Sequence, residues 1–105
     1  MSDTLHRVRM RIAERDYRFS SNAYDKLDEL GIDGTDVLSG IGRARVVEDY
    51  PTYGKGPCVL VLQETQSGPI HALWGFVKQT DRPAVLVTVY RPDSKRWSED
   101  YMERR

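Results

Sequence analysis

Residues 58–77, CVLVLQETQSGPIHALWGFV, decide the fold of this chain. An apolar run, CVLVL, is followed by the turn-rich residues 66–69, and a second apolar run begins at Ile70. Branched and aromatic residues favour strands, and a short turn joins strands that run antiparallel. The stretch therefore predicts two neighbouring antiparallel strands, at Cys58–Glu64 and Ile70–Val77.

Two further strands are predicted on either side of this pair, at Arg45–Tyr50 and Ala84–Arg91, beyond the turn-rich segments 51–57 and 80–83. Eight of the ten valines lie at or after Val46. The runs VLVL and AVLVTV have no polar alternation, which is typical of strands covered on both faces. These two strands are therefore expected in the interior of a four-stranded antiparallel sheet.

The first part of the chain has the spacing of helices instead. Leu5, Val8 and Ile12 predict a first helix of about three turns, within the N-terminal segment 1–16. The short segment Tyr17–Ser20 could be a strand that leads into a helix cap. Because helices come first and strands follow, the chain is expected to fold as a single α+β domain over residues 1–105.

Two more helices are expected before the strands, and one after them. Ser20 or Ser21 can cap a helix with a Gly31 end, and Asp33 or Thr35 can cap a shorter one. The tail after Pro92, DSKRWSEDYMERR, is predicted as a short C-terminal helix docked by its aromatic residues.

Charge and composition exclude several classes of protein. The 105 residues carry 16 basic and 16 acidic side chains, whereas nucleic-acid-binding domains usually have a pI above about 9. Residues 1–20 have a net charge of +2, residues 21–50 of −4 and residues 51–105 of +2. Any contact with nucleic acid must therefore be local.

The remaining classes are limited by motifs. The single cysteine, Cys58, excludes an intrachain disulfide and heads a buried strand, where a thiol is usually inert. No Walker loop, dinucleotide fingerprint or zinc motif is present, so neither a cofactor nor a metal is expected. A polar N-terminus and the absence of long apolar runs predict a cytoplasmic protein without a membrane segment.

His71 and Glu48 are the candidates for proton transfer. A histidine within a strand can act as a general acid or base near neutral pH, or can simply hydrogen-bond to its neighbours. Glu48 shares a strand face with Tyr50 and could accept a proton or orient a histidine, or mark a solvated strand end. Asp49 lies on the opposite face, so these two acids are not a facing catalytic pair.

Cationic and aromatic candidates follow the last strand and the first helix. Arg91, rigid beside Pro92, suits a phosphate or carboxylate, or could pair with a nearby acid; Tyr90 could stack on a base. Arg7, Arg11 and Arg15 recur on one helix face, which is typical either of phosphate contact or of a solvated surface.

These motifs together resemble a small bacterial family catalogued as domain of unknown function 4258. The resemblance covers residues 17–105 and rests on YRFSSNAYDKLDELGI, VVEDYP, PIHALW and VTVYRPDSKRW in this order. The family is grouped by fold with RelE-like and BrnT-like toxins and barnase-like, metal-independent ribonucleases. The resemblance implies helices packed on one face of the four-stranded sheet, with residues 1–16 as an extra N-terminal helix.

The resemblance also implies an RNA-cleaving groove, and as partners RNA and a small zinc-finger antitoxin-type protein. In this hypothesis His71 or Glu48 transfers protons, Arg91 and Lys26 hold the phosphate, Tyr90 stacks, and all converge on one open groove. Family members usually carry a histidine and an arginine where this chain has Asn22 and Lys26.

Asparagine does not shuttle protons and lysine lacks the guanidinium fork, so activity is expected to be weakened or lost. The alternative is a non-catalytic protein-interaction module, for which an exposed apolar patch without convergent polar groups would be the sign.

Overall fold

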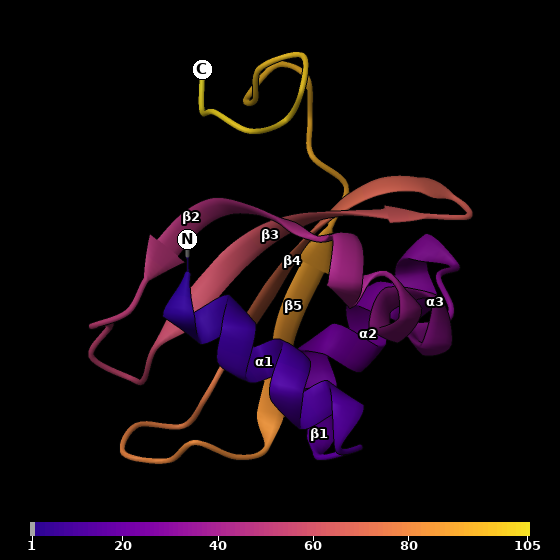
Figure 1. The fold of residues 1–105 in the computed structure, drawn as a ribbon. Coiled ribbons are helices and arrows are strands. Elements are labelled where there is room, and N and C mark those ends of the chain that lie inside the picture. The colour runs from indigo at the N-terminus through magenta and orange to yellow at the C-terminus, as the bar shows by residue number, and fades with distance from the viewer. Residues whose placement is uncertain (1) are drawn as a thin grey trace.

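Helices occupy the first part of the chain and strands the second (Figure 1). The computed structural model describes residues 2–105, so Met1 of the segment 1–16 lies outside the described residues. The elements are α1 (Asp3–Ala13), β1 (Tyr17–Phe19), α2 (Ser21–Leu30), α3 (Gly34–Ser39), a 3-10 turn (Ile41–Arg43), β2 (Arg45–Tyr50), β3 (Cys58–Thr65), β4 (Gly68–Gly75) and β5 (Ala84–Tyr90).

The strands form one five-stranded mixed sheet in the order β1-β5-β4-β3-β2. The pairs β2–β3, β3–β4 and β4–β5 are antiparallel, and β3 and β5 are interior strands as predicted. The expected cover on both faces is wrong for β5, because Val87 is 37 % exposed on the side away from the helices. The expected four-stranded antiparallel sheet is wrong, because β1 adds a fifth strand parallel to β5, with Tyr17 opposite Ala84. The possible strand at Tyr17–Ser20 is thus present, but its pairing with a strand near the other end of the chain has no local sequence signature.

The helices pack on one face of this sheet, and α1 crosses in front of β3, β4 and β5 (Figure 1). Side chains alternate along a strand, so one set from each strand enters the core between the two layers. The core contains, among others, Val8, Leu27, Val37, Val59, Val61, Ile70, Trp74 and Leu86. The α+β class is therefore confirmed.

Helix ends follow the expected capping chemistry. The Ser20 side chain accepts a hydrogen bond from the amide of Ala23 at 3.0 Å, and the Asp33 carboxylate accepts one from Thr35 at 3.0 Å. Gly31 ends α2 at φ +67°, a left-handed conformation that costs glycine nothing. Of these two helices, α2 packs on β5 and β1, and α3 packs on β3.

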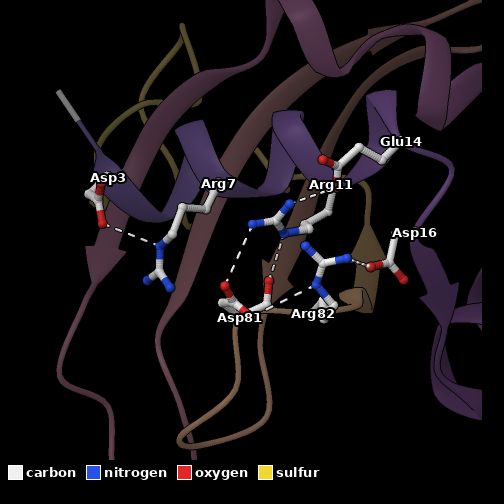
Figure 2. A network of polar contacts seen from close by, with 7 residues as sticks. All are labelled: Asp3, Arg7, Arg11, Glu14, Asp16, Asp81 and Arg82. Carbon is white, nitrogen blue, oxygen red and sulfur yellow. Dashed lines mark hydrogen bonds and ion pairs between the residues drawn. The ribbon is translucent and has the colours of Figure 1, made fainter.

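The arginines of α1 hold the helix onto the domain (Figure 2). Arg11 is 8 % exposed; its guanidinium donates to Glu14 and to the main-chain carbonyl of Asp81, in the loop between β4 and β5. Arg82 of the same loop pairs with Asp16 at 3.4 Å. A face that could have tracked phosphates is thus partly committed to contacts within the chain.

Two neighbouring arginines are committed in the same way. Arg9 donates to the carbonyls of Ile41 at 3.0 Å and Ala44 at 2.8 Å, and so ties α1 to the turn before β2. The Arg7 guanidinium lies over the ring of Phe76, 5.0 Å from its centre.

The predicted C-terminal helix is wrong, because residues 92–105 form turns instead. Side chains in this segment hydrogen-bond to nearby amides, which competes with helix formation. The Asp93 carboxylate accepts from the amide of Lys95, and the Asp100 carboxylate accepts from the Ser98 hydroxyl and from the amide of Met102.

Candidate functional site

The sheet face turned away from the helices, here called the outer face, carries most of the candidate residues. In β4, Ile70, Ala72 and Trp74 enter the core, so His71 and Leu73 lie on the outer face. Strict alternation would put Glu48 of β2 and Tyr90 of β5 on the core side.

Two β-bulges place the side chains of Glu48 and Tyr90 on the outer face instead. The register of β2 shifts between Val46 and Glu48, and that of β5 shifts opposite Leu73 and Trp74. A bulge adds one residue to a strand and so turns the following side chains to the other face. Tyr90 consequently lies opposite His71 on the outer face.

His71 is 0 % exposed and uses both ring nitrogens. Nε2 lies 2.8 Å from the main-chain carbonyl of Tyr101, and Nδ1 lies 3.1 Å from the hydroxyl of Tyr90. A carbonyl only accepts, so Nε2 carries the proton and Nδ1 accepts from the hydroxyl. Burial lowers the pKa of His71, which keeps the imidazole neutral.

Glu48 is held by an arginine from the tail. Arg104 donates to both of its carboxylate oxygens, at 2.7 and 2.9 Å, and the Tyr50 hydroxyl donates to Oε1. The pKa of Glu48 is lowered mainly by the hydrogen bond from Arg104, and that of Tyr50 is raised by its bond to Glu48. The carboxylate therefore stays ionised and paired.

The C-terminal tail, residues 92–105, covers this cluster. The Trp97 ring packs edge-on against His71, with 4.5 Å between the two ring centres. The Arg104 guanidinium lies over the Trp97 ring, 4.7 Å from the centre of that ring. His71 is thus buried by the tail and not by the helices. The imidazole, the carboxylate and both tyrosine hydroxyls near them face partners within the chain.

The other three candidate residues lie elsewhere. Arg91 donates to the carbonyls of Ser67 at 2.9 Å and Leu30 at 3.5 Å, so it reaches the end of α2 on the helical side. Lys26 and Asn22 are on α2: Lys26 pairs with Glu29 at 3.6 Å, and the Asn22 side chain accepts from the hydroxyl of Thr88 at 3.3 Å.

The six predicted site residues are therefore divided. Glu48, His71 and Tyr90 share one chain of contacts under the tail, while Arg91, Lys26 and Asn22 are outside it. The structure does not bring the six side chains together in one open groove.

Beside the covered cluster, the outer face is open and hollowed. This outer groove has a volume of about 580 Å³ and is lined mainly by apolar and aromatic side chains. They include Tyr50, Tyr53, Leu73, Val77, Val85 and Val87. Among the residues that the structure describes, Arg18 and Lys55 are the charged ones in its lining. Cys58 also borders it, and burial raises the pKa of that thiol, so it is protonated and unreactive at neutral pH.

Sequence reasoning missed the tail residues Tyr101 and Arg104 and the groove residues Arg18, Tyr53 and Lys55. One signal was available for Arg104: a carboxylate on a sheet face needs a cation, and the basic tail supplies several. No signal was available for the groove, whose lining comes from all five strands and from the two connections before β3 and after β4.

Among residues 2–105, no group of three or more His, Cys, Asp or Glu side chains is placed to hold a metal ion. No described helix combines the length and the apolar composition needed to span a bilayer.

The mixed sheet with helices on one face and a buried histidine on the other defines a small two-layer α+β protein. The chain belongs to the family described as Domain of unknown function (DUF4258), whose family model matches residues 19–91. The match includes Glu48, His71 and Tyr90 but neither α1 nor the tail. No curated protein and no solved structure matches the chain.

Proposed function

We propose that this chain is a non-catalytic interaction module whose outer groove holds an apolar, acid-flanked segment of a partner protein. The observation that carries the proposal is an open, mainly apolar hollow with two cations and no acid in its lining. Its volume of about 580 Å³ falls within the usual range for ligand sites.

The chemistry of the lining indicates what would bind. Leu73, Val85 and Val87 offer apolar area, and Tyr50 and Tyr53 add aromatic area, so a leucine or phenylalanine side chain fits. Arg18 and Lys55 favour a carboxylate beside it.

The neighbouring cluster supports a role without catalysis. A general base must reach the proton that it abstracts. His71 is buried and both of its ring nitrogens are hydrogen-bonded within the chain, so neither is free to contact a substrate. Glu48 is engaged by Arg104 in the same way.

Binding of short fluorescent peptides tests this proposal. We expect a phenylalanine–leucine core flanked by glutamates to bind, and the same core flanked by lysines to bind at least about tenfold more weakly. Val87→Glu adds a carboxylate to the groove and should abolish binding of the glutamate peptide. Met10→Glu, at a similarly exposed apolar position on α1, is the matched control and should bind normally. Equal affinity for both peptides, or no loss in Val87→Glu, would refute the groove as the site.

A second candidate, a toxin-like ribonuclease, is favoured by one observation: Glu48, His71, Tyr90 and Arg104 form one connected cluster on the outer face. A carboxylate, an imidazole and a guanidinium are the groups that metal-free RNA cleavage requires. This candidate function includes kinship with RelE-like and BrnT-like toxins. It also includes action in the bacterial cytoplasm and a zinc-finger antitoxin-type protein as partner.

Induced expression separates the two candidates. Growth arrest with RNA cleavage by the wild type but not by His71→Ala would favour the ribonuclease. Absence of arrest with either chain, together with glutamate-peptide binding, would favour the interaction module.

A further inference from the structure

Strand β1 lies at the margin of the sheet and pairs only with β5. The amide of Ala84 donates to the carbonyl of Asp16 at 3.1 Å, and the amide of Ser20 donates to the carbonyl of Leu86 at 3.0 Å. In a parallel ladder, the residues that bond to one neighbour alternate along the strand. Between these two bonds, Arg18 therefore faces β5, and the main-chain N–H and C=O of Tyr17 and Phe19 point away from the sheet.

The helical side of this edge is aromatic. Tyr17 and Phe19 lie with their ring centres 5.9 Å apart, and Tyr24 of α2 meets Phe19 at 5.5 Å. Tyr24 is 61 % exposed, an unusual state for a residue that adjoins the core. These rings form part of a hollow of about 590 Å³ between β1, α2 and the start of α3, whose far side carries Asp28 and Asp33 and therefore does not favour an acid over the rings.

The outer side of the same edge is cationic. Arg18 lies between Tyr17 and Phe19 in sequence and lines the outer groove. A strand added to β1 would alternate in the same way. Its residue opposite Arg18 would lie on the outer face, and the residues before and after it would lie over the aromatic rings.

A second β1 strand does not suit this edge. Because β1 has only three residues, an antiparallel pair of β1 strands keeps its hydrogen bonds only when centred on Arg18. That register places two arginines directly opposite each other, and like charges in this position are destabilising. The charge of Arg18 instead favours an extended segment that carries an acid at the position opposite Arg18.

We propose that the β1 edge is a strand-addition site for an extended partner segment with the pattern apolar–acidic–apolar. The free main-chain groups of Tyr17 and Phe19 supply affinity, and the alternation of Arg18 with the aromatic rings supplies specificity. This site shares Arg18 with the outer groove but rests on the sheet edge, and slowed amide exchange at Tyr17 and Phe19 distinguishes it from occupancy of the groove.

The probe is a short peptide of alternating valine and glutamate, with a valine–lysine peptide as its control. Amide hydrogen exchange measured by NMR should slow at Tyr17 and Phe19 when the glutamate peptide binds, and should stay unchanged at Arg18, which already bonds to β5. The lysine peptide should bind roughly fivefold more weakly, because a like charge faces Arg18.

Two variants make the test specific. Arg18→Glu should reverse the preference between the two peptides. Tyr24→Ala, which removes an exposed ring and leaves the outer groove intact, should weaken the alternating peptide about threefold or more, without affecting the glutamate-flanked groove peptide. Absence of binding, binding without slowed exchange at Tyr17 and Phe19, or an unreversed preference in Arg18→Glu would each overturn the proposal.

Discussion

Replacing Trp97 with alanine should detach the tail and expose His71. Trp97 is 4 % exposed and is the only buried residue from Arg91 to the end of the chain. It contacts the ring of His71 and carries the guanidinium of Arg104. No other tail side chain can replace this contact.

The magnitude follows from the position of Trp97. A buried tryptophan changed to alanine typically costs about 3–5 kcal/mol when the whole domain loses it. The remaining tail contacts are the hydrogen bond from His71 to the carbonyl of Tyr101, the exposed ion pair of Arg104 with Glu48, and turns, and each of these contributes only about 1 kcal/mol or less. The tail should therefore open before the domain unfolds, so the free energy of unfolding should fall by less than about 3 kcal/mol.

NMR titration of His71 is the assay. The pKa of His71 is lowered mainly by burial, so its exposure in Trp97→Ala should raise that pKa toward the ordinary value for histidine. Trp97→Phe keeps an aromatic edge against His71 and should shift the pKa much less.

One result would refute the argument. If the pKa of His71 is unchanged while urea unfolding shows the full loss of about 3–5 kcal/mol, Trp97 belongs to the cooperative core and the tail is not a separable cover.

Three further predictions concern stability, each measured by urea unfolding. The pKa of His71 is lower in the folded chain than in the unfolded chain, so the unfolded chain binds the proton first as pH falls. The contribution of His71 to the free energy of unfolding is therefore complete above about pH 6.5 and declines below it. A free energy of unfolding that stays constant between about pH 7.5 and 5.5 would contradict this. Gln63→Leu removes two buried hydrogen bonds and leaves their partners unsatisfied, which should cost about 2 kcal/mol or more; a neutral effect would mean that water replaces them. Gly34→Ala places a Cβ 2.5 Å from the Phe19 ring and should destabilise the fold, whereas Gly42→Ala, with open space around it, should not; equal effects would rule out the clash.

Local patterns predicted the elements that depend on neighbours in sequence. The strands at β2, β3, β4 and β5 lie within a few residues of the predicted positions, because period-two alternation and turn residues act over a short range. The caps at Ser20 and Asp33 were predicted for the same reason, since a cap needs only an oxygen and an amide two or three residues away.

The candidate site could be predicted only in part. His71, Glu48 and Tyr90 were identified as residues, and the structure places them in one cluster. Their meeting depends on the two bulges, which reverse the side-chain alternation at Glu48 and Tyr90. Nothing in a single sequence marks a bulge without glycine.

The sequence by itself determined the α+β class, the helix caps, the four main strands and membership of the family that matches residues 19–91. Only the tertiary structure decided that β1 joins β5, that the tail buries His71, and that the outer groove lies open. The reason is that the first set depends on contacts a few residues apart, whereas the second depends on pairing between distant parts of the chain. The free energy of such pairing arises only once the layers have packed.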